Sequence, residues 1–413
     1  VNFIEPQASK EFTVPVGNLK PQAGTEYFVN FNVTTVEKEP LIPIGHEIAC
    51  DQFRLPIESP KKAFKTSGPK LTVSTNGDNL SASSSKVNFI FNKKTGIVTS
   101  YKVDGTEYFS EGFGIQPNFW RAPTDNDYGN GMPKRLQIWK ESSKNFNVTD
   151  ATVTMDGNNA VVNVNYLLPA GNLYIVNYTI YPSGAVNVAA RFTSTDMDAA
   201  QTEVSESTRT ATFTPGRDAA RKEASKLNVP RIGVRFRLPA SMNQVEYFGR
   251  GPAENYLDRN AGSMVGLYKS TAEELYFPYV RPQENGHHTD TRWVSLSTGK
   301  KGLLIQADNT IGFNALRNSI EDFDDEEATG LSRQWSNFTP EQVANHDEAA
   351  AKNVLRRQHH INDITPRDFV EVCVDLKQQG VAGYDSWGSR PEPAYTLPAN
   401  REYNWGFTLI PLK

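Results

Sequence analysis

Apolar and polar residues alternate along many short stretches of this chain, with a period of two. The alternation is clear in residues 27–33, 161–166, 174–181 and 232–238. A period of two predicts half-buried strands, because successive side chains of a strand point to opposite faces of the sheet. Turn signals such as Lys94-Thr95-Gly96 separate these stretches. Short strands and turns that continue from about residue 71 onward predict an all-β protein with a large antiparallel sandwich.

The pattern divides the chain into three parts. Residues 1–58 predict a small β-sandwich, whose strands include 27–33 and 45–53. Residues 59–68 contain Pro, Lys and Ser without periodicity, which is typical of a linker. Residues 69–413 would form the large antiparallel domain. Within it, only 217–227 has a helical pattern.

The composition mainly argues against certain partners and sites. The chain has 413 residues, a formal net charge of −4 and a pI near 6.0, which gives no electrostatic reason for a nucleic-acid or membrane-surface partner. It has no apolar run of about 18 residues, so no membrane span is predicted. Cys50 and Cys373 are far apart, which argues against a disulfide framework or a zinc site, and we expect two thiols buried in strands. The chain opens on Val1 without an initiating Met or a signal peptide, so we expect an excerpt of a longer protein, from either the cytoplasm or the periplasm.

Trp387 lies in the segment GYDSWGSRP, where glycines, serines and proline predict a loop. An indole on a loop offers a flat apolar face with an N–H group at its edge. The C–H-rich face of a sugar ring packs well on such a surface. The local sequence also allows Trp387 to plug the end of a β-sandwich, so a sugar contact and a packing role are both open.

The densest polar loop is FWRAPTDNDYGNG. Asp125 and Asp127, followed by Gly129, resemble the start of a calcium-binding loop, but no third acidic ligand and no glutamate follow at the required spacing. We therefore expect both aspartates to accept hydrogen bonds from backbone N–H groups and from Arg121, which would hold an irregular loop in shape. The glycines at its end would let the tail of the loop move.

Residues 248–259 carry carboxylates and guanidinium groups together. Glu254 and Asp258 are close enough to suggest a carboxylate pair for glycoside hydrolysis. Arg250 and Arg259 flank them, however, and neighbouring arginines lower carboxylate pKa values, which suits ion pairs and not a general acid. We therefore expect structural ion pairs in this segment.

Histidines and acidic residues give no strong metal motif. His287 and His288 are adjacent, as are His359 and His360, and adjacent side chains on a strand point to opposite faces and do not easily ligate one metal. The acidic run 321–327 favours a solvated loop, and whether it binds a cation stays open. The sequence contains no P-loop, GxGxxG or Ser/His/Asp grouping.

Four motifs, taken together and in this order, resemble the C-terminal part of the large bacterial β-galactosidases of glycoside hydrolase family 2. They are WRAPTDNDYGNG (120–131), YFGRGPAENYLDR (247–259), YVRPQENGHHTDTRW (279–293) and GYDSW (383–387). The preceding GHEIACDQF resembles the end of the immunoglobulin-like domain that comes before the last domain of that family, although Cys50 stands where a tryptophan is expected. Residues 205–228 and 321–353 match less well. The resemblance covers nearly the whole chain.

The resemblance implies a partial immunoglobulin-like sandwich over 1–58 and a super-sandwich over 69–413, similar in fold to galactose mutarotase. It implies that the two catalytic glutamates lie upstream on a TIM-barrel domain, and that upstream domains bind the Mg and Na of the parent. No stretch of this chain shows the βα alternation of such a barrel. We therefore expect no catalytic residue and no metal ligand here, and no activity from this chain alone.

The resemblance also gives roles to two loops. The tryptophan that Trp387 matches reaches into the active site and stacks on the sugar in the aglycone position. Gly129, Asn130 and Gly131 match a mobile segment that opens and closes beside the pocket. The parent is expected to hydrolyse terminal β-D-galactosides such as lactose with retention and to form a homo-oligomer.

Three other functions stay open on the sequence. A free-standing carbohydrate-binding module would use Trp387 without any upstream domain. A mutarotase-like epimerase would need a histidine and a glutamate facing one sugar, and the adjacent histidine pairs with His46 and His346 supply no convincing set. A scaffold for oligomerisation is the third.

Overall fold

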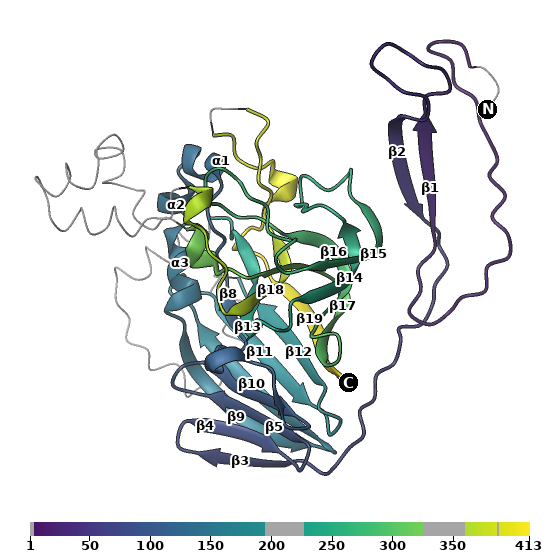
Figure 1. Cartoon of the computed structure of the whole chain (residues 1–413). Helices are drawn as coiled ribbons and strands as arrows, with labels where there is room; N and C mark the ends of the chain where they lie inside the picture. Colours follow the sequence, from purple (N-terminus) through teal and green to yellow (C-terminus); the bar gives the residue numbers. More distant parts are fainter. Residues whose placement is uncertain (1–3, 195–226, 325–359, 386–387) are drawn as a thin grey trace, which may run out of the picture. The chain divides into compact units, whose positions relative to one another are not determined.

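The structure is a computed structural model that describes residues 4–194, 227–324, 360–385 and 388–413 (Figure 1). Its contacts divide the chain into two compact units, Val1–Phe64 and Lys65–Lys413. The expected division into an immunoglobulin-like part at 1–58, a linker at 59–68 and a super-sandwich at 69–413 stays a prediction.

The described part of the first unit contains one antiparallel sheet of two strands, β1 (Phe28–Thr34) and β2 (Glu47–Arg54). The alternation predicted both strands. It also predicted that one face would be half-buried, and this is wrong, because Val33 and Phe53 are each 54% exposed. A sheet buries a face only against a second layer, and two strands supply none. Cys50 on β2 is exposed for the same reason, whereas Cys373 is buried as expected.

The second unit begins with a five-stranded antiparallel sheet in the order β3-β4-β5-β6-β7. Its strands are β3 (Thr72–Asn76), β4 (Asn79–Ser83), β5 (Val87–Asn92), β6 (Ile97–Val103) and β7 (Thr106–Glu107). Phe89 and Phe91 point to one face of β5, and their ring centroids lie 5.6 and 6.2 Å from that of Tyr178 in the larger sheet. The hydroxyl of Tyr101 donates to the carbonyl of Gly184 at 2.6 Å. The two sheets therefore share one core.

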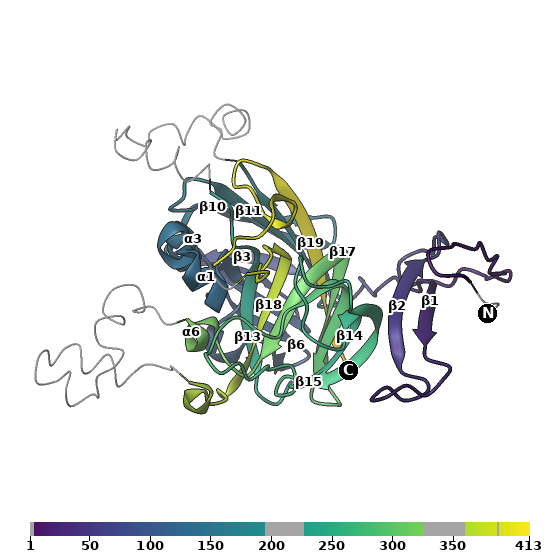
Figure 2. The same cartoon turned by 90° about the horizontal axis from the view of Figure 1, so that it is seen from above.

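The larger sheet of this unit has twelve strands among the described residues, with the order β15-β14-β16-β17-β19-β12-β11-β10-β9. Figure 2 shows this unit from above, with β13, β18 and β17 near its centre. A branch runs from β17 through β18 and β13 to β8. The strands are β8 (Gln116–Asn118), β9 (Asn147–Asp156), β10 (Asn159–Leu167), β11 (Leu173–Ile180), β12 (Val186–Phe192), β13 (Arg231–Pro239), β14 (Gln244–Gly251), β15 (Met264–Thr271), β16 (His288–Ser297), β17 (Gly302–Leu316), β18 (Phe369–Gln378) and β19 (Tyr403–Leu412). Their pairings are antiparallel, which confirms the predicted all-β class.

The branch forms on β17, which has 15 residues. Its first part, 302–307, pairs with β19, and its last part, 312–316, pairs with β18. β19 in turn lies between β17 and β12. One long strand thus joins the part of the sheet formed by β9–β12 to the part that contains β13 and β18.

Short helices interrupt the strands. They are α1 (Asp125–Gly129), α2 (Met132–Arg135), α3 (Gln137–Lys144) and α6 (Ile320–Phe323), with 3-10 turns at Ser110–Gly112, Ile361–Asp363 and Pro393–Tyr395. The prediction that only 217–227 would be helical is wrong, and 217–226 lie outside the described residues. Thr124 starts α1 with a capping box, since its side chain accepts from the Asp127 amide and Asp127 accepts from the Thr124 amide. The loop predicted at 119–131 therefore contains a short helix at 125–129.

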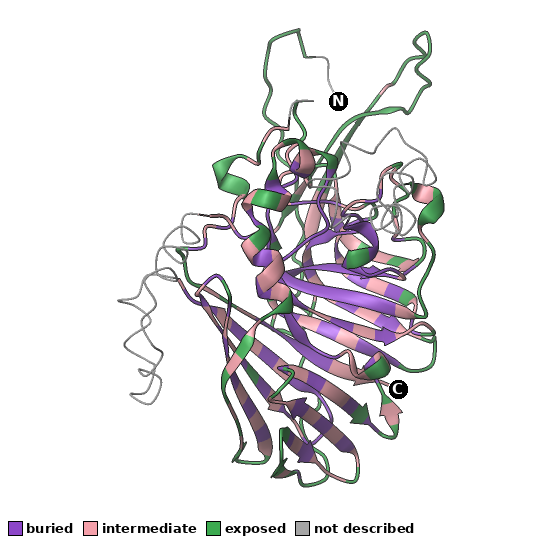
Figure 3. Ribbon diagram, turned by 90° about the vertical axis from the view of Figure 1, so that its left-hand side faces the viewer, coloured by how far each residue is buried: buried purple, intermediate pink, exposed green. Residues whose placement is uncertain are grey.

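The core of the second unit is rich in aromatic rings. Phe119 lies 5.1 Å from Tyr174 and 5.8 Å from Phe192, centroid to centroid, and Trp139 on α3 lies 5.9 Å from Phe192. Figure 3 shows buried residues alternating along the strands of this unit. Burial of each such ring away from water stabilises the folded state by about 1.5–3 kcal/mol. In the part of the chain that the structure describes, the helices are all too short or too polar to cross a bilayer.

Candidate functional site

A buried arginine, Arg121, holds the backbone that leads into the GYDSW segment. Its Nε and Nη2 atoms each donate to a carboxylate oxygen of Asp127 at 3.0 Å. Nη1 donates to the Gln378 side chain and to the Gln379 carbonyl, and Nη2 also donates to the Gly380 carbonyl. All five N–H groups of the guanidinium therefore have an acceptor, which a fully buried charge requires. The predicted contact between Arg121 and Asp127 is confirmed.

Asp258 holds the next two residues of the same backbone. Its Oδ1 accepts from the amide of Val381 at 2.9 Å, and its Oδ2 accepts from the amide of Ala382 at 2.7 Å. Gly380 packs so closely on this carboxylate that a Cβ atom there would collide with it. Ala382 and Gly383 then adopt positive φ values of 55° and 100°. Four consecutive backbone groups are thus fixed by one cation and one anion immediately before the loop begins.

The segment 129–131 contacts the chain on the other side of this loop. A Cβ atom on Gly129 would lie 3.0 Å from the Cα of Gly388, and a Cβ on Gly388 would collide with the backbone of Gly129. Asn130 donates from Nδ2 to the carbonyl of Ser389 at 3.3 Å. Gly131, with a φ of 72°, follows at the start of α2. The structure therefore brings Gly129 and Asn130 next to the residues that follow Trp387, while their mobility stays a prediction.

The third motif anchors α1 from outside. The side chain of Gln283 accepts from the Asp125 amide and donates to the Asp125 carboxylate, both at 3.0 Å. Arg281 lies 3.5 Å from that carboxylate and 3.8 Å from the centroid of the Tyr128 ring. The prediction that Asp125 would accept from Arg121 is wrong. Side chains two positions apart on a helix point in directions about 200° apart. Asp127 therefore faces inward while Asp125 faces outward.

The suggested carboxylate pair is engaged in structural contacts. Glu254 accepts from Arg259 at 2.9 Å, from the Gly286 amide at 2.7 Å and from the Tyr279 hydroxyl. Asp258 binds backbone amides, as described above. The expected ion pair is confirmed for Glu254 and wrong for Asp258. Arg250 also departs from expectation, since it pairs with Asp290 at 2.6 Å. It sits on β14 and Asp290 on the neighbouring strand β16, which brings them together.

Trp387 itself, with Ser386, lies outside the described residues. The base of its loop is described. The amide of Gly383 donates to the Ser389 hydroxyl at 3.4 Å, and the amide of Ser389 donates to Asp385 at 3.1 Å. The first, second and fourth motifs therefore meet at the two ends of one loop, and the third motif contacts α1 of the first.

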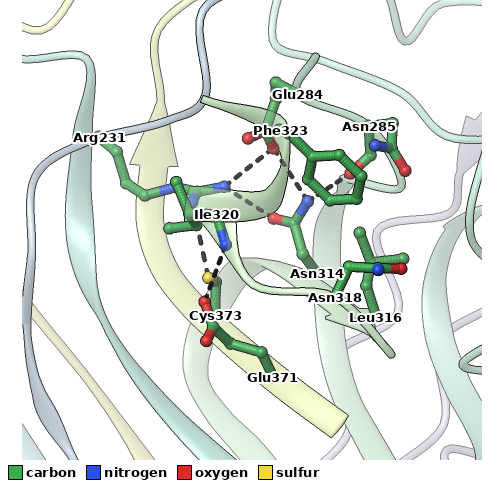
Figure 4. A pocket seen from close by; sticks show the side chains of 10 residues that line it. All are labelled: Arg231, Glu284, Asn285, Asn314, Leu316, Asn318, Ile320, Phe323, Glu371 and Cys373. Atoms are coloured by element: carbon green, nitrogen blue, oxygen red, sulfur yellow. Dashed lines mark hydrogen bonds and ion pairs between the residues drawn. The ribbon is translucent and has the colours of Figure 1, made fainter. Parts of the chain in front are cut away.

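A second buried arginine, Arg231 on β13, lies in a cluster that sequence reasoning missed (Figure 4). Its Nη2 atom donates to Glu284 at 3.1 Å and to Asn314 at 2.8 Å. Its Nε atom lies 3.2 Å from the Asp375 carboxylate, at an angle that does not form a hydrogen bond. Gln378 also donates to Glu284, at 3.0 Å. The cluster therefore sets one cation against two carboxylates, and its members come from separate segments that no local spacing links.

Because the cluster has one carboxylate more than it has cations, one of its carboxyl groups holds its proton to a higher pH than usual. Burial raises the pKa of Asp375 to about 7; the charge of Arg231 acts against this rise and that of Glu284 adds to it. A cavity of about 20 Å³ borders Arg231, Glu284, Asn314 and Cys373. A cavity of this size holds about one water molecule. The cluster thus offers no room for a sugar ring.

His287 and His288 are each 1% exposed. Nδ1 of His287 lies 2.9 Å from the Asn314 side-chain oxygen, and the ring nitrogens of His288 contact the carbonyls of Gly286 and Pro252. Burial lowers the pKa of His287 to about 3 and that of His288 to about 4, so both are neutral at pH 7. Neither ring is exposed to a substrate, which disfavours mutarotase chemistry. Within 4–194, 227–324, 360–385 and 388–413, no three His, Cys, Asp or Glu side chains gather as a metal site.

The acidic run is not a solvated face where it is described. Its carboxylates bind partners in the second unit: Glu321 binds Arg235, Asp322 binds Arg367, and Asp324 binds Trp120 and Lys140. The prediction of a solvated loop is therefore wrong for 322–324, because α6 turns Asp322 inward through a capping box with Ser319, whereas the Glu321 side chain is 38% exposed. Residues 325–327 lie outside the described residues.

Comparison with known families identifies the class of protein. The family described as the β-galactosidase small chain matches residues 83–409, and the family described as β-galactosidase domain 4 matches residues 1–56. The first match spans most of the chain. The chain therefore belongs to the β-galactosidase small-chain family.

Its relatives include whole enzymes and a separate subunit. The chain is 30% identical over 413 residues to a β-galactosidase of Priestia megaterium, covering 99% of this chain and 34% of the relative. It is 25% identical to a β-galactosidase of Streptococcus thermophilus, covering 98% of this chain and 33% of the relative. It thus spans about a third of the length of these relatives. A β-galactosidase small subunit of Latilactobacillus sakei is 27% identical, covering 78% of this chain and 92% of the relative.

Solved structures with a similar fold include a galactose 1-epimerase and a galactose mutarotase-like protein. A galactose 1-epimerase of Lactobacillus acidophilus is 7% identical with a TM-score of 0.41, covering 83% of this chain and 98% of that chain. A galactose mutarotase-like protein of Lactobacillus casei is 10% identical with a TM-score of 0.38, covering 81% and 100%. Scores of this size support no conclusion about shared chemistry.

Proposed function

We propose that this chain is the C-terminal, non-catalytic portion of a β-galactosidase of glycoside hydrolase family 2. The parent would hydrolyse terminal β-D-galactosides with retention, through two glutamates on an upstream TIM-barrel domain. Upstream domains would also hold the Mg²⁺ and Na⁺ of the parent, and residues 1–58 would belong to an immunoglobulin-like domain. Membership of the small-chain family and the one-third coverage of its longer relatives support this proposal.

Within that enzyme, this portion would complete the mouth of the active site. Trp387 would stack on the sugar in the aglycone position, such as the glucose of lactose, and so position the glycosidic bond. Gly129, Asn130 and Gly131 would form the mobile segment beside it. The observation that carries this proposal is the clamp before the loop: Arg121 and Asp258 fix four successive backbone groups from Gln379 to Ala382. A tryptophan that must meet a sugar needs such a fixed base.

The first test is hydrolysis of a chromogenic aryl β-galactoside by this chain alone at high protein concentration. We expect no turnover, because Glu254 and Asp258 are occupied by structural donors. Adding the upstream portion of the parent as a separate chain should restore turnover if the two portions associate. Turnover by this chain that survives repurification and disappears in Glu254→Gln or Asp258→Asn would contradict the proposal.

The second test is Trp387→Ala in the full-length parent. Loss of an aromatic stacking contact should weaken the handling of lactose by about 1–3 kcal/mol, and Trp387→Phe should retain much of it. Steady-state kinetics with lactose measure this effect. Tyr395→Ala serves as a matched control, because Tyr395 is an exposed aromatic residue outside the loop. Unchanged lactose kinetics in Trp387→Ala would remove the proposed role.

A further inference from the structure

A second cavity, of about 380 Å³, lies where the five-stranded sheet meets the larger sheet. Lys86, Val103, Asp104 and Thr106 come from the β5–β7 side. The turn between β16 and β17 contributes Lys300 and Lys301, and the end of β19 contributes Leu412 and Lys413. Small-molecule sites in proteins usually measure about 300–1,000 Å³. The cavity is thus large enough for a metabolite, and the proposed function does not use it.

The charges around this cavity are strongly unbalanced. Four lysines line it, Lys86, Lys300, Lys301 and Lys413, against one side-chain carboxylate, that of Asp104. Asp104 lies 3.0 Å from the Lys413 ammonium group and 3.8 Å from that of Lys86. One carboxylate leaves three of the four positive charges without compensation by a lining side chain. A concave site of this kind concentrates anions.

The cationic groups converge from distant parts of the chain onto fixed positions. Asp104 occupies a tight hairpin turn with a φ of 49°, followed by Gly105 at 78°, and its carboxylate pairs with the ammonium groups of Lys86 and Lys413. The Lys86 side chain is only 19% exposed. Lys301 donates to the Thr106 hydroxyl at 3.0 Å across the two sheets. Lys300, Lys301 and Lys413 are exposed, so their ammonium groups are accessible to a dissolved anion.

The remaining lining suits the body of an organic ligand. Val103, Tyr108, Pro411 and Leu412 supply apolar surface, and Ser183 supplies a hydroxyl group. Tyr108 is 2% exposed, and burial raises its pKa to about 12, so the phenol is neutral and does not repel an anion. Ammonium groups bind phosphate oxygens as point charges and need no planar partner.

We propose that this cavity binds a small phosphate ester, with the phosphate group on Lys86, Lys301 and Lys413 and the organic body on the apolar floor. The lysines belong to both sheets, so an occupied site would tie the sheets together. Asp104 would compete with the phosphate for Lys86 and Lys413. Replacing Asp104 should therefore strengthen binding, whereas replacing a lysine should weaken it.

Isothermal titration calorimetry on the 413-residue chain tests this at low ionic strength. The probes are a hexose 6-phosphate, a nucleoside 5′-monophosphate, inorganic phosphate, and the unphosphorylated hexose and nucleoside. We expect at least one ester to bind more tightly than inorganic phosphate, and the unphosphorylated compounds not to bind. No binding by either ester at millimolar concentration, or inorganic phosphate binding as tightly as both esters, would overturn the proposal.

Variants of the lining residues should change the affinity for the ester in opposite directions. Lys86→Met and Lys301→Met should each weaken ester binding about tenfold, since each removes a charge-assisted contact. Asp104→Asn should tighten it severalfold, and asparagine tolerates the left-handed backbone of this turn. Lys94→Met makes the same charge change at an exposed position in the turn at the opposite end of β5 and should leave binding unchanged. Equal weakening by Lys94→Met, or weaker binding in Asp104→Asn, would show only general charge attraction and overturn the assignment.

Discussion

The two buried arginines of the second unit have their positive charges compensated in different ways. Arg121 faces one carboxylate, that of Asp127, and its other donors meet neutral oxygens of Gln378, Gln379 and Gly380. Arg231 faces two carboxylates, and its Nε–H is poorly aligned with one of them. The first centre is neutral and fully hydrogen-bonded. The second centre has a surplus negative charge, which is neutralised only when one of its two carboxylates binds a proton.

The difference separates a structural centre from one that titrates. The Arg121 centre pairs one cation with one carboxylate, so it carries no surplus charge. The Arg231 centre keeps a proton on Asp375 up to about pH 7. We therefore expect the Arg231 centre to dominate the stability of the unit and its pH dependence, and the Arg121 centre to govern the loop.

The largest expected effect comes from Arg231→Met. It leaves Glu284 and Asp375 buried without a cation, so we expect a loss at or above the upper end of about 3–5 kcal/mol in the free energy of unfolding. The loss should grow between pH 6 and pH 8, because the abandoned carboxylates must take up protons. Urea unfolding at both pH values measures it. A loss below about 1 kcal/mol, or one independent of pH, would break the comparison.

Arg121→Met should cost somewhat less, about 3–4 kcal/mol, because only the carboxylate of Asp127 is abandoned. The backbone at 378–380 should also lose its anchors, so amide hydrogen exchange in the following segment should quicken. Arg121→Lys restores the charge but not the five donors, and should recover only part of the stability. Full recovery by lysine would mean that charge alone, and not the hydrogen bonds, holds the loop.

The pH dependence of unfolding sharpens the comparison further. Between about pH 4 and 6.5 the unfolded chain binds protons at His287 and His288 that the folded protein does not, so their contribution makes stability rise with pH. Asp375 acts in the opposite sense from about pH 4 to 7, because the folded protein keeps a proton that the unfolded chain has released. Each net proton contributes a slope of about 1.4 kcal/mol per pH unit.

Two variants separate the contribution of the histidines to the pH dependence of stability from that of Asp375. Asp375→Asn removes the opposing term and should steepen the rise in stability, whereas His287→Gln should flatten it. Unfolding midpoints in urea across this range provide the measurement. An unchanged profile in Asp375→Asn would show that this carboxyl is ionised in the folded protein.

The smallest effect is expected from Asp258→Asn. Asparagine keeps one acceptor oxygen but loses the charge and one of the two amide contacts, so the loss should be about 1–2 kcal/mol. Hydrogen exchange should quicken at the amides of Val381 and Ala382. Asp290→Asn removes a similar carboxylate from a half-exposed ion pair and should leave those amides unchanged. Unaltered exchange in Asp258→Asn would mean that Arg121 alone fixes this segment.

The sequence allowed the strands to be predicted because alternation is a local property of the chain. Burial of the β1 face was wrong because it depends on a second layer, which two strands do not contain. The helix at 125–129 was missed although Thr124 and Asp127 have the spacing of a capping box. The dense run of Asp, Asn and Gly in this segment is typical of a loop, and this composition masks the capping signal.

The candidate site was predictable in its motifs but not in its contacts. Trp387, Arg121 and Asp258 all lie in segments that stood out. The partner of Asp258, however, is a backbone amide 123 residues away, and a backbone amide has no signature in the sequence. Arg231 directly precedes the strand predicted at 232–238, and no local motif marks Arg231 or Asp375 as part of a buried charge cluster. Their association appears only when β13 and β18 pair.

The position of β19 has a consequence for how the protein is made. This strand, Tyr403–Leu412, is the last in the described chain, yet it sits in the interior of the sheet between β12 and β17. A ribosome must translate more than two hundred residues after β12 before the neighbour of β12 exists. Until then β12 presents an open edge, which exposes the nascent chain to mispairing and aggregation. A message truncated before the codon for Tyr403 would therefore yield a chain that cannot close its sheet.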